Sequence, residues 1–399
     1  MAKPSATVAA LGFPATVALT EAAARLAASG RRVIPLASGD PDLPTPPHIV
    51  EAAVRAIRSG ATHYPPVRGT GALREAIADK LARENGIRVS VDQIMVAPGA
   101  KSALFSAVRA LVDPGDDVLI LDPSWVTYAP LVELAGARAV RVQLDANRNY
   151  LIERGALERH IGNRTKAILL NSPCNPTGRI ATRDELETVG SVANDHDLCV
   201  VSDEIYEHFV FNGATHCSLA ADDRYASRVM VVNGFSKSYS MTGWRLGWLA
   251  GPQALVDLAS RVQAQTVTSA ATFTMAAGVA ALTGPQDVVA EARVLYSSRR
   301  KLMLDIWAST GSVRCPASEG TFYLFPHTPT GIPDVEVTGT LLGEHGVACV
   351  PGSVFGDCGS GRLRIALTAP TDQIETAANS IAATFATMEG SRNTLSRPA

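Results

Sequence analysis

The sequence lacks a surplus of charge of either sign, and it lacks any long apolar run. Its 399 residues carry a formal net charge of -2 at pH 7, so the composition provides none of the basic surface that nucleic acids or anionic membranes attract. No stretch reaches the length of a membrane span without charge, glycine or proline. We therefore expect no nucleic-acid partner and no membrane insertion.

Cysteine is scarce and scattered. The six cysteines show no CxxC spacing, and several lie in apolar runs such as 198–201, so reduced thiols in a cytoplasm are expected. No cluster of histidine or cysteine suggests a metal site. The first residues lack a charged segment followed by a sustained apolar one, which argues against an export signal. The sequence thus predicts a cytoplasmic protein without a bound metal.

What the sequence does have is a regular alternation of helical patterns with short apolar runs from about residue 48 to 285. This alternation predicts an α/β fold in which helices cover a mainly parallel sheet whose strands are buried on both faces. The expected strands are 93–97, 117–121, 167–170, 198–202 and 229–233. The expected helices are 71–84, 101–111, 126–135 and 184–194.

The chain is long enough for two domains, and its pattern changes after an amphipathic stretch at 287–307. Residues 321–325 and 362–366 are predicted strands of a smaller C-terminal α/β domain. The predicted units are an N-terminal arm at 1–38 that packs on the small domain, a large cofactor-binding domain at 39–285 and a small domain at 286–399.

In sheets of this kind, ligands bind beyond the carboxyl ends of the strands. Lys237 follows the strand at 229–233 between small hydroxyl residues, and Arg245 lies eight positions later between glycines. A lysine amine forms an imine with an aldehyde, and an arginine fork binds a phosphate. The pair therefore predicts pyridoxal 5'-phosphate as a covalently held cofactor. The alternative is an exposed lysine in a serine-rich loop, with Arg245 in a surface ion pair.

Two more strand ends carry candidate residues. Asp203 ends an apolar strand, where a buried carboxylate needs a cationic partner such as a protonated pyridine nitrogen, and Tyr206 can donate to the phenolic oxygen of the cofactor. Asn175 lies in a loop made rigid by prolines, and it can present its amide to the ring oxygen and to a substrate carboxylate. The alternatives are an aspartate that caps the following turn and a plain turn around Asn175.

Three further positions have two interpretations each. The segment 98–101 opens a helix whose first amides can bind a phosphate, or else its small residues only cap the helix. Trp125 either stacks on the pyridine ring or packs in a loop. Arg364, in a predicted strand, either clamps a substrate carboxylate or faces solvent at a sheet edge.

Together these segments resemble the fold-type I, class I pyridoxal-phosphate aminotransferases, and in particular the bacterial aspartate aminotransferases of the prokaryotic subgroup. The similarity covers nearly the whole chain, with the matching segments in the same order and at similar separations. They are 3–7, 38–42, 63–66, 98–102, 124–126, 171–178, 201–207 and Lys237 with 241–247.

The resemblance implies a role toward the cofactor for each matching residue. Lys237 would form the imine and move the proton between the substrate and the cofactor. Asp203 would pair with the ring nitrogen, Tyr206 and Asn175 with the ring oxygen, and Trp125 would stack on the ring.

The resemblance also implies how the phosphate and the substrate are held. The phosphate would be bound by Arg245, by the amides of Ala100 and Lys101, and by Tyr64 from the second subunit of a homodimer. Gly39, Asn175 and Arg364 would clamp the substrate's alpha-carboxylate beside Trp125. The Lys101 side chain would bind the distal carboxylate of an acidic substrate.

The chain departs from the family pattern in two places. Gly234 stands where many relatives have a serine that binds the phosphate, and Leu43 and Pro44 replace an aromatic-acidic pair of the aspartate subgroup. The expected function is amino transfer between aspartate or glutamate and a 2-oxo acid such as 2-oxoglutarate. The alternatives are a pyridoxal-phosphate enzyme of the same fold that performs elimination or cyclisation on a modified amino acid, and a ligand-sensing domain without catalysis.

Overall fold

A large, mainly parallel sheet organises the molecule. The structure is a computed structural model that describes residues 3–316 and 318–395, with side chains through residue 390. Within these residues the largest sheet has seven strands in the order β2-β8-β7-β6-β5-β3-β4. β8 runs antiparallel to both of its neighbours, and the other pairs are parallel. The strands are β2 (Ile94–Ala97), β3 (Asp117–Asp122), β4 (Arg138–Gln143), β5 (Thr165–Asn171), β6 (Cys199–Asp203), β7 (Val229–Gly234) and β8 (Gly247–Ala250).

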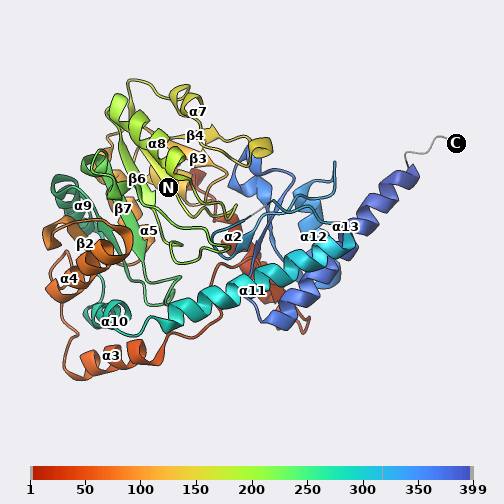
Figure 1. Ribbon diagram of the computed structural model, residues 1–399, viewed down its shortest axis with the longest axis horizontal. Helices are drawn as coiled ribbons and strands as arrows, with labels where there is room; N and C mark the ends of the chain where they lie inside the picture. The colour runs from red at the N-terminus through yellow and green to blue at the C-terminus, as the bar shows by residue number, and fades with distance from the viewer. Residues whose placement is uncertain (1–2, 317, 396–399) are drawn as a thin grey trace.

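Helices bury both faces of this sheet, which confirms the predicted α/β class. Along β2, Met95 and Ala97 belong to one apolar cluster, whereas Ile94 and Val96 belong to another on the opposite face. The first face is covered by α5 (Ala100–Leu111), α6 (Tyr128–Leu134) and α9 (Gln253–Thr266). The second is covered by α3 (Pro47–Arg58), α4 (Gly71–Lys80), α7 (Arg154–Glu158), α8 (Arg183–Asp195) and α10 (Thr272–Thr283), as Figure 1 lets the reader follow.

All five predicted strands of the sheet are present, but β4 and β8 were not predicted. β4 is an edge strand with exposed arginines, so it lacks the apolar run of its neighbours. β8 has only four residues and begins with a glycine, so its apolar run is too short to stand out. The helix expected at 71–84 ends as an α-helix at Lys80 and continues as a π-helical turn, η1 (Leu81–Asn85), which Gly86 closes in the left-handed conformation with φ 70°.

The C-terminal part of the chain has small sheets and long helices. β11 (Val350–Pro351), β12 (Leu363–Ala366) and β9 (Tyr323–Leu324) form one antiparallel sheet, and β1 (Ile34–Pro35) pairs with β10 (Val347–Ala348). β9 is shorter than predicted because Thr321 adopts a positive φ of 63°. The helices of this part are α11 (Asp287–Thr310), α12 (Asp334–His345) and α13 (Thr371–Leu395), whereas α1 (Ala6–Ala10) and α2 (Ala15–Ala28) lie at the start of the chain. Figure 1 shows α11 running from the region of α10 to α13, against which it packs.

An aromatic cluster joins the end of β6 to the C-terminal part. Phe322 is fully buried, and its ring centroid lies 5.4 Å from that of Tyr206 and 5.2 Å from that of Tyr296 on α11. Phe209 and Tyr323 pack against the same ring. This cluster holds Tyr206 in place next to the carboxyl end of the sheet.

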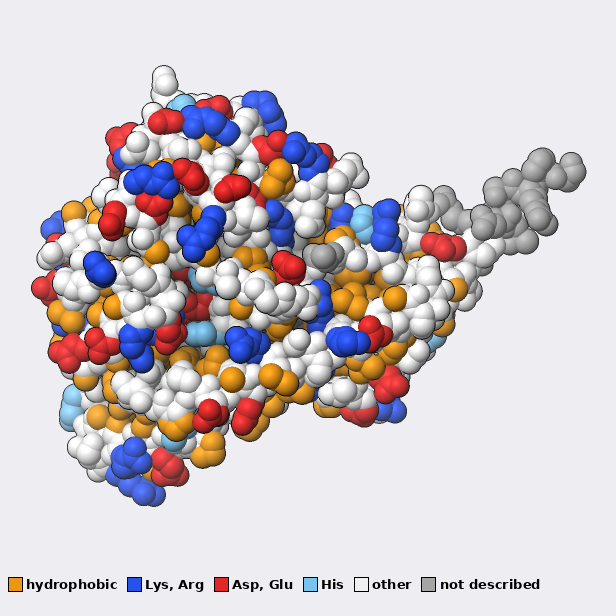
Figure 2. Space-filling view, viewed as in Figure 1, with side chains coloured by type: hydrophobic (Ala, Val, Ile, Leu, Met, Phe, Trp, Pro, Cys, Tyr) orange, Lys and Arg blue, Asp and Glu red, His pale blue; other side chains and the backbone are white. Residues whose placement is uncertain are grey.

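The surface carries charges of both signs. Figure 2 shows positive and negative side chains interspersed over the face in view, in keeping with a net charge near zero. Among the described helices, none combines the length and apolarity needed to cross a membrane.

Replacing Phe322 with alanine should lower the free energy of unfolding by about 3–5 kcal/mol, because it leaves a cavity in the middle of the aromatic cluster. Urea unfolding followed by tryptophan fluorescence measures the change. Val335→Ala, at a side chain that is 60% exposed, is the control and should change stability by less than about 0.5 kcal/mol. Equal stabilities for the two variants would show that the cluster does not hold this part of the fold together.

Candidate active site

The carboxyl ends of β5, β6 and β7 and the start of α5 surround a cavity of about 440 Å³. The C-terminal part closes it with Tyr323 and Arg364, and α2 adds Thr16, Val17, Thr20 and Glu21. The predicted site residues that line it are Gly39, Ala100, Lys101, Trp125, Asn175, Asp203, Tyr206, Lys237, Arg245 and Arg364. Tyr64 is the one predicted residue outside it, with 89% of its surface exposed.

Lys237 brings an amine into this cavity from the loop between β7 and β8. Its Nζ donates a hydrogen bond of 2.8 Å to the carbonyl oxygen of Gly39. Burial lowers the pKa of Lys237 to about 8, and the positive charges of Arg364 and Arg245 act in the same direction, although Asp40 and Asp203 oppose them. A substantial share of neutral amine near pH 8 is what attack on an aldehyde requires.

Asp203, the last residue of β6, is the buried acid of the cavity. Its Oδ2 accepts a 2.8 Å hydrogen bond from the Tyr128 hydroxyl, and its Oδ1 accepts one of 3.2 Å from the amide of Ile205. Burial raises the pKa of Asp203 to about 6, and these two hydrogen bonds limit the rise. The second bond is the turn cap that the sequence left as an alternative. The carboxylate therefore caps the turn and still faces a space that suits a protonated ring nitrogen.

Tyr206 and Tyr323 form the wall between Asp203 and the C-terminal part. Their hydroxyl oxygens lie 3.0 Å apart. A Cβ atom on Gly39 would lie 1.9 Å from the Tyr323 hydroxyl, so only glycine fits there. Gly39 thus has two effects: its carbonyl oxygen accepts the hydrogen bond from Lys237, and its missing side chain leaves room for the Tyr323 hydroxyl.

Arg364 is a buried guanidinium on the central strand of its sheet, not a solvent-facing edge residue. It is 2% exposed, and it donates to Asn175 Oδ1 at 3.1 Å and to the Ala37 carbonyl at 2.6 Å. Its plane lies over the ring of Tyr323, with 4.5 Å to the centroid. No ion pair with a described residue neutralises it. A buried cation without an acidic partner in a cavity is a site for a carboxylate.

The start of α5 and Arg245 form an anion cradle. Arg245 donates to the Thr242 carbonyl at 2.9 Å. Gly99 has a φ of 85°, and a Cβ atom on it would lie only 2.6 Å from Arg245 Nη2, so this position requires glycine. The first amides of a helix have no acceptor within the helix, so those of Ala100 and Lys101 are free to bind an anion. Burial lowers the pKa of Lys101, and the charge of Arg245 adds to the effect. An aldehyde cofactor with a phosphate and a basic ring fits this set of groups.

The aromatic lining explains the position of Trp125. Its ring packs edge-on against Tyr128, with centroids 5.4 Å apart, and Lys101 Nζ lies 5.0 Å from its centroid. The departure at Gly234 also has a structural reason. A Cβ there would lie 2.9 Å from both the Cα of Gly247 and the carbonyl oxygen of Leu246, so the close approach of β7 and β8 requires glycine in this chain.

Three residues of the site were not found from the sequence. Tyr128 bonds to Asp203, Tyr323 contacts both Tyr206 and Arg364, and Asn171 accepts the Asn175 amide at 2.8 Å while donating to the Asp203 carbonyl at 2.9 Å. Asn171 lies in the segment 171–178 that follows the strand predicted at 167–170, but no role was assigned to it from the sequence. Tyr128 and Tyr323 carry no local signal, since their partners are distant in the sequence.

The comparisons with known proteins agree with this geometry. Residues 31–381 match the family model described as aminotransferase class I and II. The chain is 39% identical to an aspartate aminotransferase of Pyrococcus abyssi over 358 residues, which cover 88% of this chain and 91% of the relative. It is 38% identical to that of Geobacillus stearothermophilus, over 94% of this chain and 96% of the relative.

Solved structures show the same similarity. The aspartate aminotransferase from Thermus thermophilus with maleate superposes with a TM-score of 0.91 at 36% identity, covering 96% of this chain and all of that one. The aspartate aminotransferase from Rhizobium meliloti also superposes with a TM-score of 0.91, at 34% identity, over 97% of this chain and 99% of that one. The chain therefore belongs to the class I and II aminotransferases, the pyridoxal-phosphate-dependent enzymes that transfer an amino group between an amino acid and a 2-oxo acid.

Proposed function

We propose that this enzyme transfers the amino group of aspartate or glutamate to a 2-oxo acid such as 2-oxoglutarate, with Lys237 as its proton carrier. The observation that supports this most directly is the common cavity of a partly buried amine, a buried carboxylate and a buried guanidinium without an acidic partner. When bound, pyridoxal phosphate supplies an aldehyde for amino groups and a ring that withdraws electrons from the alpha carbon of the substrate.

Different residues of the cavity would bind the substrate, move the proton and hold the cofactor. The Arg364 guanidinium, fixed by Asn175 and Ala37, binds the substrate's alpha-carboxylate and so orients the alpha carbon. The Lys237 amine, whose lowered pKa suits a base near neutral pH, takes the alpha proton and returns it. The Asp203 carboxylate, with Tyr128 as its hydrogen-bond donor, would pair with the ring nitrogen. Arg245 and the start of α5 would hold the phosphate.

Lys101 supports an acidic substrate. Its ammonium reaches the cavity above Trp125, and none of the ion pairs among the described residues includes it. A second carboxylate on the substrate would give the Lys101 ammonium a negatively charged partner. Glu21 on α2 lines the same cavity, but its side chain is 66% exposed and lies 3.9 Å from Arg25, so its field there is weakened by solvent.

The alternative of elimination or cyclisation was suggested by Leu43 and Pro44. Neither residue lines the cavity, and Leu43 packs against the apolar cluster of the C-terminal part. The neighbouring Asp42 pairs with Arg299 of α11 through two contacts of 2.7 Å. The departure thus concerns how this segment is anchored, and it gives no support to a different reaction.

A homodimer in the cytoplasm completes the proposal. Tyr64 lies outside the cavity of its own chain and is 89% exposed, which suits a residue that binds the phosphate of the other subunit. Arg245 is also exposed in the single chain. All six cysteines are free, in accordance with a reducing compartment.

In cofactor-free protein, Lys237 should react with acetic anhydride along a titration curve centred near pH 8. Burial lowers its pKa to about 8 from the ordinary 10.5, so the neutral, reactive amine is present at lower pH than on a normal lysine. Peptide mass spectrometry after short pulses over a pH series measures the midpoint, with the exposed Lys166 as internal control for the reagent. A midpoint at 10.5 would contradict the buried position, and turnover by Lys237→Ala would exclude its catalytic role.

Lys101→Met should lower kcat/KM for aspartate about 10- to 100-fold, the loss that corresponds to a hydrogen bond between charged groups. The backbone amide at position 101 is kept, so phosphate binding through it is not removed. Steady-state kinetics with alanine as amino donor is the control, because alanine has no distal carboxylate. Equal losses with aspartate and alanine would assign the side chain to the phosphate instead.

Mixing inactive Lys237→Ala subunits with impaired Tyr64→Ala subunits should restore activity if the sites are shared. In a hybrid dimer, one site has Lys237 from one chain and Tyr64 from the other, so random exchange should restore about one quarter of the wild-type turnover. The assay follows activity during mild denaturation and refolding of the mixture. Each variant refolded alone is the control, and no gain on mixing would reject the shared site.

A further inference from the structure

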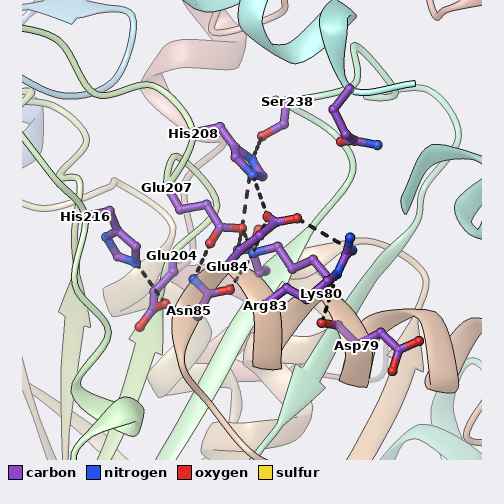
Figure 3. A network of polar contacts seen from close by, with 12 residues as sticks. Asp79, Lys80, Arg83, Glu84, Asn85, Glu204, Glu207, His208, His216 and Ser238 are labelled. Carbon is purple, nitrogen blue, oxygen red and sulfur yellow. Dashed lines mark hydrogen bonds and ion pairs between the residues drawn. The ribbon is translucent and has the colours of Figure 1, made fainter. Parts of the chain in front are cut away.

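A polar network lies directly behind the cavity; it is buried at Glu204, Glu207 and Lys80 and reaches the surface at Glu84. At the end of β6 and just after it, Asp203 and Tyr206 line the cavity, whereas Glu204 and Glu207 point away from it into the network. Figure 3 shows Glu204 beside His216, and Glu207 beside Lys80 and Asn85. The network is thus continuous in sequence with two residues of the active site.

The π-helical turn η1 supplies the opposite side of the network. Its Asn85 donates to Glu207 Oε2 at 2.6 Å, and Lys80, which precedes it, donates to Glu207 Oε1 at 2.5 Å. Its Glu84 accepts from His208 Nε2 at 3.2 Å. The wider turn of a π-helix changes which side chains share a face, and here Lys80, Glu84 and Asn85 all meet the segment after Asp203.

His208 connects this network to the lysine loop. Its Nδ1 lies 2.8 Å from the hydroxyl oxygen of Ser238, the residue after Lys237, and its Nε2 is held by Glu84. Ser238 is 4% exposed and does not line the cavity, so its hydroxyl points away from the substrate. Figure 3 shows the row from Ser238 through His208 to Glu84.

We propose that His208 is a positioning residue for Lys237: anchored by Glu84 on η1, it holds the Ser238 hydroxyl and so fixes the loop that aims the lysine amine into the cavity. This inference rests on the proposed role of Lys237. Loss of the contact leaves Ser238 without its partner in a buried place and lets the loop shift, and small displacements of a reacting group cost rate more than they cost binding.

Two amide side chains separate the two contacts of the imidazole. In His208→Asn, the amide occupies the place of Nδ1 and can still meet Ser238, whereas in His208→Gln it reaches the place of Nε2 and can meet only Glu84. H208Q and S238A should each lower kcat about 10- to 100-fold, with KM changed less than about twofold. H208N should retain kcat within about threefold, and the double variant H208Q/S238A should be no worse than either single variant, because both remove one contact.

A second readout does not depend on turnover. In cofactor-free protein, the backbone amides of 236–241 should exchange hydrogen faster in H208Q and S238A than in the wild type, while H208N should match the wild type. His160→Gln is the control, since the His160 side chain hydrogen-bonds to the Ala156 carbonyl and not to the lysine loop. Thermal unfolding of each variant confirms that it is folded.

The outcomes separate the positioning role from the proposed function. Borohydride reduction of the wild-type holoenzyme, followed by peptide mass spectrometry, should place the cofactor on Lys237. If it does, and H208Q then matches the wild type in both kcat and exchange, the positioning role alone is wrong. If H208N is as impaired as H208Q, the imidazole serves packing and not the Ser238 contact, which also overturns it. If the cofactor is not on Lys237, the proposed function fails and this inference fails with it.

Discussion

The site depends on keeping two ionisable groups of opposite charge, Lys237 and Asp203, in one cavity without an ion pair between them. Lys237 is held by the Gly39 carbonyl, and Asp203 is held by the Tyr128 hydroxyl. Burial moves the pKa of the lysine down to about 8 and that of the aspartate up to about 6. An unpaired buried charge is costly, so this separation is maintained only because the surrounding fold imposes it.

The neighbouring groups explain why this separation suits pyridoxal phosphate. The cofactor's aldehyde, basic ring nitrogen and phosphate correspond to the amine of Lys237, the carboxylate of Asp203 and the cradle at Arg245. The cradle works because Gly99 allows the arginine to approach the start of α5. Under the proposed function, these three groups would hold the cofactor, and each of them is positioned by its own contacts.

The C-terminal part is as necessary to the site as the large sheet. Arg364 on β12 and Tyr323 on β9 reach the cavity across the aromatic cluster around Phe322. The polar network lies on the other side of the cavity, where it connects the segment after β6 and the lysine loop to η1. Arg364 and Tyr323 thus reach the cavity from one side, and η1 supports the Lys237 loop from the other.

Much of the fold could be predicted because parallel strands buried on both faces leave continuous apolar runs, as at 117–121 and 229–233. β4 and β8 escaped prediction, since an edge strand with exposed arginines and a short return strand leave no such run. The π-helical turn was also missed, because its hydrogen-bond pattern has no distinct residue signature.

The sequence by itself determined which chemical groups follow each strand: an amine at Lys237, a carboxylate at Asp203, an amide at Asn175 and a guanidinium at Arg245. Only the tertiary structure decided that Tyr128 meets Asp203, that Arg364 faces the cavity, and that the nearby Arg362 lies over the ring of Tyr150 instead. The physical reason is that strand ends follow from local patterns, whereas contacts between residues distant in sequence depend on how the helices and sheets pack.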